Sequence, residues 1–447
     1  MPGAPVSGGP STPLVINTES AYPPPTAGEL ESAVLVGKKA SHDEARALRY
    51  LLQETARKLV PQHRVNGCLW WLARGAEAVE VHYSPAQERA RYRQLAVCGS
   101  VWACPVCSAH VGEERAGEIR EALAKHTAAG GSAAFATFTV SHAHEDSLET
   151  VLAGFLAAFR SLTSKPSYAR LRGRWGVLGF VRVLEVTYGR NGWHVHVHAL
   201  YLLRDPQDEA AVARLEGELY PLWEAAAAKH GLSMDRRFGL QVKPAYGTVE
   251  EYLAKFGRGP RWDIAREIAK GHLKQGRSLA GLKHLTPWEL LAAARAGDKR
   301  CGVLFREYVE RFTGRAQLYW SPGYASQLRG ATRSDEAIAE GYAESQLAGE
   351  IPSPVWESVK RAGGRVRVLE LVELAGGEWG LAAAYLAGVV AEFPPYVRRD
   401  LLRVPAELRS ALDQLRHDQA ERNRWRPLPA GPGDRDVGAP DQVAESA

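Results

Sequence analysis

An α+β fold, built on an antiparallel sheet with helices on one face, is predicted by three features of the sequence. Strand-like and helix-like segments follow one another in the order β-α-β-β-α-β-α between residues 133 and 260. Two of these strands are joined by Asn191-Gly192, a dipeptide typical of two-residue hairpin turns, so they run antiparallel. Residues 285–425 are mostly helical in pattern and predict a helical extension.

The individual elements follow from local patterns along the 447 residues, a length typical of two or three domains. Thr248 and Glu251 fit a capping box, so one helix begins near Thr248. Apolar residues at helical spacing predict further helices over 41–60, about 112–128, 147–163 and 206–230. Runs of β-branched and aromatic residues predict strands over 133–141, 177–188, 194–203 and 240–244.

Composition excludes several classes of protein. Five cysteines are too few for a disulfide-built scaffold, and the longest apolar run, Val151 to Phe159, is too short to cross a membrane. The N-terminal segment lacks the cationic start and apolar block of a secretory signal. We therefore expect a cytoplasmic protein with reduced thiols and no membrane partner.

Basic residues are concentrated in one segment. The whole chain carries a net charge of +5, whereas residues 255–300 contain 11 Lys and Arg against four acidic residues. Such a segment is either a solvated helical face or a contact for the phosphate backbone of DNA or RNA. The candidate contacts are Lys255, Arg258, Arg261, Arg266, Lys270, Lys274 and Arg277.

Three histidines alternate along the second hairpin strand, in the run Gly192-Trp-His-Val-His-Val-His. Because side chains in a strand alternate between faces, His194, His196 and His198 leave the same face. Neutral imidazole nitrogens are common ligands of divalent metals, and three stacked buried histidines would otherwise each need polar partners. Glu185, on the partner strand, is a candidate carboxylate ligand, with a surface cross-strand pair as the alternative.

A second metal site is predicted from cysteine spacing. Cys104 and Cys107 have the C-x-x-C spacing that lets two thiolates bind one Zn²⁺, and Cys98 adds a third. Cys68 is the expected fourth ligand, with His110 and His82 as rivals. A closed site of four thiolates is structural and not catalytic.

Two further segments add chemistry. Tyr252 and Lys255, in the run Tyr-Leu-Ala-Lys, share a helix face, and a tyrosine hydroxyl can attack phosphorus with a cation nearby to stabilise the charge. The strand Phe135-Ala-Thr-Phe-Thr places Thr137 and Thr139 on the same face as Phe135. Each segment alone is weak evidence of function. The order in which the segments occur along the chain strengthens that evidence.

These blocks, in this order, resemble the motifs of HUH-class replication initiators of rolling-circle plasmids, nearest to those from GC-rich bacteria. Phe-x-Thr-x-Thr resembles the first motif, Gly-Trp-His-x-His-x-His the metal motif, and Tyr252-Leu-Ala-Lys-Phe the nucleophile motif. The run Leu318-Tyr-Trp-Ser-Pro-Gly resembles a late block of the same initiators. The likeness covers roughly residues 65–330.

The resemblance implies a metal-dependent, strand-specific DNA endonuclease and ligase. Tyr252 would form a 5′-phosphotyrosine at the plasmid origin and release a 3′-OH that primes synthesis. His196 and His198 would be the central ligands of Mn²⁺ or Mg²⁺, with His194 or Glu185 as the third. Thr248 stands where single-tyrosine relatives tend to carry a carboxylate, which leaves open how replication terminates. Origin DNA would be the partner, with host helicase or polymerase recruited beside it.

Two other functions remain open at this point. An HUH transposase can pair a cysteine-rich region with the same motifs, although the larger ones carry two helix tyrosines. A zinc-dependent DNA-binding regulator would have a purely structural histidine strand. The expected division of the chain is a disordered tail (1–30), a zinc-knuckle region (31–128), the HUH core (129–260), a basic DNA-contacting extension (261–345), a helical C-terminal region (346–426) and a second disordered tail (427–447).

Overall fold

The computed structural model describes residues 42–245, 284–330, 333–340 and 344–394, and it falls into two compact units. The first unit takes its described residues from Met1–Ala76 and Arg93–Glu344. The second takes them from Glu77–Tyr92 and Ser345–Ala447. The chain therefore leaves the first unit and returns to it, and residues 77–92, expected in the zinc-knuckle region, pair with the C-terminal region.

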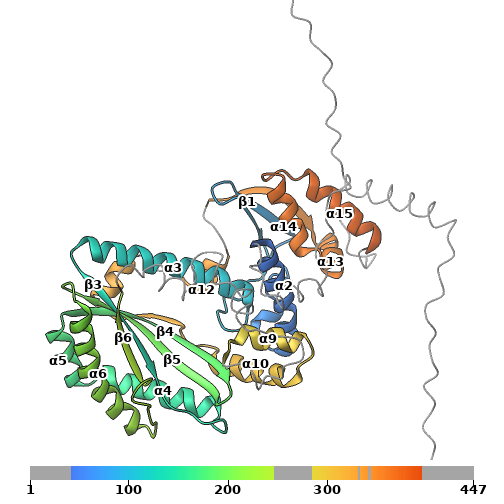
Figure 1. Ribbon diagram of the computed structural model, residues 1–447. Coiled ribbons are helices and arrows are strands. Elements are labelled where there is room, and N and C mark those ends of the chain that lie inside the picture. The colour runs from blue at the N-terminus through green and yellow to red at the C-terminus, as the bar shows by residue number, and fades with distance from the viewer. Residues whose placement is uncertain (1–41, 246–283, 331–332, 341–343, 395–447) are drawn as a thin grey trace, which may run out of the picture. The chain divides into compact units, whose positions relative to one another are not determined.

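A six-stranded antiparallel sheet is the centre of the first unit (Figure 1). The strand order is β6-β3-β5-β4-β7, and β8 also pairs with β4. The alternation of Val195, Val197 and Ala199, all fully buried, with the three histidines sets which face of β5 is core. The strands are β3 (Ser132–Thr139), β4 (Val177–Gly189), β5 (Gly192–Leu203), β6 (Leu240–Pro244), β7 (His284–Leu285) and β8 (Leu318–Trp320).

Helices cover both faces of this sheet, which corrects the expectation of helices on one face. Helices α4 (Leu148–Thr163), α5 (Pro166–Arg174) and α6 (Glu209–Lys229) lie on the valine face, where Trp223 packs edge-on against Phe138 and Phe155. On the histidine face, α3 (Pro105–Ala128) and α11 (Tyr324–Arg329) pack over one end of the sheet. These two helices bury Leu200 and Leu202, and Arg115, Ala116 and Ile119 of α3 line a small pocket together with Glu185.

Further helices in the described part of the first unit pack on α3 and on one another. Helix α2 (His42–Leu59) packs against α3 and α9 (Pro287–Arg295), and α9 packs against α10 (Lys299–Phe312). A short 3-10 turn, η2 (Arg64–Asn66), follows α2, and α12 (Asp335–Ala339) packs on α3. The capping box that begins α9 is formed by Thr286 and Glu289. The capping box expected at Thr248 lies outside the described residues.

Two local expectations differ from the structure. Helix α3 begins at Pro105 and not near 112, because Cys104 caps it by accepting the amide of Cys107. The cysteine motif therefore forms the start of a helix. The hairpin is present, but its two turn residues are Arg190 and Asn191, and Gly192 is already the first residue of β5. Gly192 has φ +81°, a conformation that favours glycine.

The described residues of the second unit form a small sheet and three helices. Its strands are β1 (Ala78–Ser84), β2 (Arg89–Arg93) and β9 (Gln346–Pro352), in the order β2-β1-β9. Its helices are α13 (Ser353–Arg361), α14 (Arg365–Leu374) and α15 (Gly380–Glu392). Trp356 is fully buried and packs edge-on against Tyr92, whose hydroxyl donates to the carbonyl of Arg365 at 2.6 Å. The helical C-terminal region is thus helical over 353–392 but begins with a strand that sequence patterning missed.

No helix in the described ranges has the length and apolar character required to span a bilayer.

Candidate metal centres

Strand register brings Glu185, His196 and His198 together on the face of the sheet opposite the valines. Glu185 on β4 is directly opposite His196 on β5, and His198 is two residues further along β5 on the same face. Opposite and diagonal neighbours across antiparallel strands are within reach of long side chains. The glutamate can therefore reach both rings, and ligand atoms of the three residues lie within 4.8 Å of one another.

Both rings point a nitrogen at the same carboxylate oxygen. The Oε2 atom of Glu185 is 3.0 Å from Nε2 of His196 and 3.3 Å from Nε2 of His198. The histidine side chains are 12% and 9% exposed, whereas that of Glu185 is 29% exposed, so the group opens to solvent on the carboxylate side. Two imidazole nitrogens and one carboxylate oxygen fit a divalent cation and leave coordination positions open, as in catalytic sites.

The electrostatics of the group favour an ionised carboxylate. Burial by itself raises the pKa of Glu185, but the charges and hydrogen bonds of His198 and His196 outweigh it and hold that pKa well below its usual range. Nδ1 of His196 is buried and has no hydrogen-bond partner among the described residues. The lowered pKa keeps the carboxylate of Glu185 in the ionised form, which is the form that binds a cation.

His194 does not belong to this group of three residues. Its Nδ1 is 3.0 Å from Nε2 of His142, and the Nδ1 of His142 is 2.6 Å from the carbonyl of Asn191. The rings still form a continuous row along the sheet, with centroids 5.1 Å apart for His142 and His194, 5.1 Å for His194 and His196, and 4.9 Å for His196 and His198. The geometry therefore groups Glu185, and not His194, with His196 and His198.

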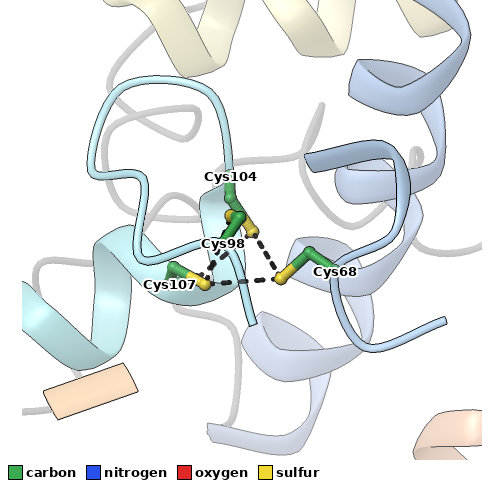
Figure 2. A group of neighbouring side chains, drawn as sticks. All are labelled: Cys68, Cys98, Cys104 and Cys107. Atoms are coloured by element: carbon green, nitrogen blue, oxygen red, sulfur yellow. Dashed lines mark hydrogen bonds between the residues drawn. The ribbon is translucent and has the colours of Figure 1, made fainter. Parts of the chain in front are cut away.

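The four cysteines of the expected zinc site converge at the start of α3 (Figure 2). Residues 69–73 pair antiparallel with residues 94–96 through backbone hydrogen bonds such as Leu69 N–H to Ala96 C=O. This pairing places Cys68 beside the loop that carries Cys98. Cys104 is the N-cap of α3 and Cys107 lies in its first turn. All four cysteines are buried and none is in a disulfide.

Sulfur spacing matches tetrahedral coordination. The Sγ atom of Cys107 is 3.5 Å from that of Cys68 and 3.6 Å from that of Cys98, and the sulfurs of Cys68 and Cys104 are 3.8 Å apart. Four thiolates at about 2.3 Å from a tetrahedral Zn²⁺ are about 3.8 Å apart. Of the rivals for the fourth position, His82 bonds to Glu80 at 2.8 Å, and neither it nor His110 belongs to the group.

Hydrogen bonds and burial shift the pKa values of the buried thiols in opposite directions. Burial opposes ionisation of Cys104, but hydrogen bonds from the other three cysteines and the Cys107 amide lower its pKa well below the ordinary value. The same hydrogen bond with Cys104, and then burial, raise the pKa of Cys107. The Gln53 amide also donates to Cys104 at 3.2 Å. All four buried sulfurs can carry a negative charge away from water only if a cation lies among them.

The predicted nucleophile and basic contacts fall outside the described residues. This applies to Tyr252 and Lys255 and to the contacts Arg258, Arg261, Arg266, Lys270, Lys274 and Arg277. Their roles stay predictions. The late block that begins at Leu318 is described: it forms β8 on the edge of β4, and Ser321 Oγ accepts the amide of Phe180 at 2.8 Å.

Sequence comparison finds curated proteins that are similar to this chain. It is 28% identical over 296 residues to the Rep protein of Streptomyces lividans, a match that covers 54% of this chain and 61% of that protein. The chain is similar to a Rep protein. This confirms the likeness that the motifs indicated. The chain is also 34% identical over 215 residues to a neomycin resistance protein of Streptomyces cyanogenus, with 41% of this chain and 49% of that protein covered.

The chain thus spans about half to three fifths of the length of the curated relatives it matches. No family model matches the sequence, and no solved structure matches it.

Sequence reasoning missed two residues that the structure brings to this face. His142 was passed over because it follows the strand in a run, Ser-His-Ala-His, with no strand or helix periodicity. Thr137 was noted only as sharing a face with Phe135, whereas its hydroxyl is 3.0 Å from Nδ1 of His198. The strand alternation of Phe-x-Thr-x-Thr was the signal that could have paired Thr137 with the histidine strand.

Proposed function

We propose that this chain is a plasmid rolling-circle replication initiator, which nicks one strand of origin DNA through a phosphotyrosine intermediate and rejoins it at termination. The single observation that carries the proposal is the convergence of Glu185, His196 and His198 on one face of an antiparallel sheet. Similarity to the Rep protein of Streptomyces lividans supports the same function independently.

The proposed chemistry is a transesterification by Tyr252. Its phenol oxygen attacks the scissile phosphorus, the bond from phosphorus to the 3′-oxygen breaks, and the phenol proton ends on that oxygen. The products are a 5′-phosphotyrosine and a free 3′-OH, and no water is consumed. Attack by another 3′-OH on the phosphotyrosine reverses these steps and rejoins the strand.

The chain's own residues have separate roles in this proposal. Glu185, His196 and His198 would hold Mn²⁺ or Mg²⁺, and imidazole ligation favours Mn²⁺. A cation bound there supplies Lewis-acid polarisation of the phosphate oxygens. Lys255 would stabilise the phenolate, and the basic residues that follow it would hold the DNA backbone. The four cysteines would hold a structural Zn²⁺ that fixes the start of α3.

Partners and location are part of the same proposal. Origin DNA is the substrate, as a single-stranded nick site with flanking duplex. A primer 3′-OH is useful only where a host helicase and polymerase act on it, so these are the expected protein partners. The reaction takes place where plasmid DNA resides, in the bacterial cytoplasm, and the reduced thiols of the cysteine site suit that compartment.

A covalent-adduct assay tests the function. The full-length protein is mixed with a labelled single-stranded origin oligonucleotide and Mn²⁺ and resolved on a denaturing gel, with and without EDTA. Tyr252→Phe is compared with Tyr246→Phe, which removes a nearby tyrosine hydroxyl outside the nucleophile motif. We expect a metal-dependent shifted band in wild type and Tyr246→Phe, and none in Tyr252→Phe.

Other outcomes contradict the proposal in distinct ways. Cleavage without an adduct would identify a hydrolase that uses water. Origin binding without cleavage would identify a DNA-binding regulator. A band that persists in Tyr252→Phe and disappears in Tyr246→Phe would move the nucleophile to the other tyrosine.

A further inference from the structure

The segment that leads into β6 presents an aromatic ring to solvent beside basic residues. Phe238 is 63% exposed, and Arg237 and Lys243 are exposed as well. A single exposed apolar side chain is common on protein surfaces, so the argument depends on where this ring lies in the sheet and on the charges beside it. We call Arg237, Phe238 and Lys243 the β6 edge.

Hydrogen bonds hold Phe238 beside β3, the strand next to the histidine strand. The hydroxyl of Thr139 donates to the carbonyl of Phe238 at 2.5 Å, and the amide of Thr139 donates to the carbonyl of Gly239 at 2.9 Å. Thr139 is in turn the register partner of His196 on β5. Phe238 is therefore two strand spacings, about 10 Å, from the histidine strand that carries the proposed metal ligands.

Strand alternation puts Lys243 on the same face of the sheet as the proposed metal centre. Gln241 is the register partner of Thr137, and Thr137 is the partner of His198, so this row of side chains leaves the histidine face. Val242 is buried against the opposite face, whereas Gln241 and Lys243 are both exposed. Lys243 lies two residues along β6 from Gln241 and leaves the same face.

Helix α3 limits the face on the other side of the metal centre. Its residues Arg115 and Ala116 line a small pocket together with Glu185 and Leu318, so α3 and β8 close in on the carboxylate from the β4 side. On the β6 side, the exposure of Lys243 shows that no described element covers the sheet there. An uncovered route therefore leads from the metal centre across β3 to β6.

The charges of the β6 edge are not neutralised within the described part of the chain. Neither Arg237 nor Lys243 forms an ion pair there. The carboxylates of Asp235 and Glu216 each accept a backbone amide instead, that of Arg237 at 2.7 Å and that of Val242 at 2.6 Å. Proteins that bind single-stranded nucleic acid combine cations that contact the backbone with aromatic rings that stack on bases.

We propose that the β6 edge binds the nicked strand as single-stranded DNA, with an unpaired base stacked on Phe238 and backbone phosphates on Arg237 and Lys243. The proposal rests on the proposed nicking function and adds the direction of the strand, from Glu185 on β4 across β5 and β3 to β6. Every base has a π face, so this contact holds the strand in place without reading its sequence.

Binding of a fluorescent origin oligonucleotide, measured by anisotropy in the full-length protein without divalent cation, tests the stacking contact. Phe238→Ala should weaken binding at least about fivefold, whereas Phe238→Tyr keeps a ring and should bind as wild type does. Tyr319→Ala is the matched control. Tyr319 is a 39% exposed aromatic residue on β8, and its register partner Arg182 is opposite Ala199 of the valine face, so it should not meet the strand.

Replacement of one base at a time by an abasic site locates the stacked base. One position should weaken binding by wild type and by Phe238→Tyr but leave Phe238→Ala unchanged, because its stacking partner is already absent. The phosphate contact has its own measurement. Lys243→Ala should lower the salt slope of binding by about 0.7, and Lys229→Ala, an exposed lysine at the end of α6, should leave the slope unchanged.

Three results would overturn the proposal: equal losses at every abasic position in wild type and Phe238→Ala, an equal binding defect in Tyr319→Ala, or an unchanged salt slope in Lys243→Ala. The phosphotyrosine assay above measures chemistry at Tyr252 and not strand binding. A positional effect at Phe238 in a protein that forms no adduct would leave this contact standing without the nicking function, and adduct formation without the positional effect would do the reverse.

Discussion

The hydroxyl of Thr137 lies 3.0 Å from Nδ1 of His198, so a residue of β3 fixes the orientation of a ring on β5. The register makes this contact obligatory, because Thr137 and His198 are direct partners across the two strands. Phe135 stacks on the same ring, with centroids 5.1 Å and planes 17° apart. With Nδ1 engaged by Thr137, Nε2 is the nitrogen turned toward Glu185.

Thr137→Val should weaken binding of Mn²⁺ roughly tenfold or more, because the isosteric side chain cannot accept the Nδ1–H that fixes the ring. Thr137→Ser keeps the hydroxyl and should retain wild-type affinity. Thr139→Val is the matched control, since its hydroxyl donates to the carbonyl of Phe238 at 2.5 Å and not to a candidate ligand. Calorimetric titration with Mn²⁺ gives the three dissociation constants, and equal affinities for all would show that Thr137 does not orient the ring.

Glu185 and His194 compete for the third position of the proposed metal centre, and a pair of substitutions separates them. Glu185→Gln removes the carboxylate charge from a group whose ligand atoms lie within 4.8 Å, so we expect at least a tenfold loss of Mn²⁺ affinity. His194→Gln removes a ring bonded to His142 and should change the affinity less than about threefold. Electron paramagnetic resonance of free Mn²⁺ measures the Mn²⁺ affinity of both variants. The reverse order of effects would assign His194 as the ligand.

The cysteine cluster should hold one zinc ion per chain, and its loss should unfold the region around α3. Structural zinc sites contribute about 10–16 kcal/mol of apparent binding free energy. This equals or exceeds the about 5–15 kcal/mol by which whole domains are stable. Cys107→Ala should therefore lose both the zinc, measured by elemental analysis, and the cooperative thermal transition of the first unit.

Cys301→Ala is the control for that experiment. Cys301 is fully buried on α10, and burial raises its pKa to about 12, but it lies outside the four-cysteine group. We expect this variant to keep its zinc and to lose only the modest stability of a trimmed core side chain. Full zinc occupancy in Cys107→Ala would mean that the cluster is a set of unrelated buried thiols.

Short-range patterns in the sequence were enough for four strands of the sheet and for some of the residues grouped at each centre. The alternation of histidine and valine fixed which face of β5 carries imidazoles, and the C-x-x-C spacing identified Cys104 and Cys107. Neither pattern contains the register between strands, which decides that Glu185 meets His196 while His194 meets His142. That choice depends on the turn at Arg190 and Asn191, one residue earlier than expected.

Pairing between segments far apart in the sequence explains the larger differences between prediction and structure. Strand β9 pairs with β1 from more than 260 residues earlier, and seven residues with a mixed burial pattern carry no period that would reveal it. For a related reason, the sequence did not predict that α3 packs on the histidine face of the sheet. Ala116, Ile119 and Leu123 give a normal amphipathic stripe, but a stripe does not say which face of a sheet it covers.

Gly192 is the position where backbone conformation and the hairpin-end contacts meet. Its φ of +81° strains any other residue, and an added Cβ would lie 3.1 Å from the Ala143 carbonyl oxygen and 3.2 Å from Cα of His144. Gly192→Ala should therefore lower stability by about 1–3 kcal/mol, measured as the shift in urea midpoint. Gly117→Ala, in the middle of α3 with nothing within 4 Å of the new methyl, should be neutral or stabilising by up to about 1 kcal/mol. A urea midpoint of Gly192→Ala equal to that of the wild type would show that the loop adapts to the added methyl at no cost in stability.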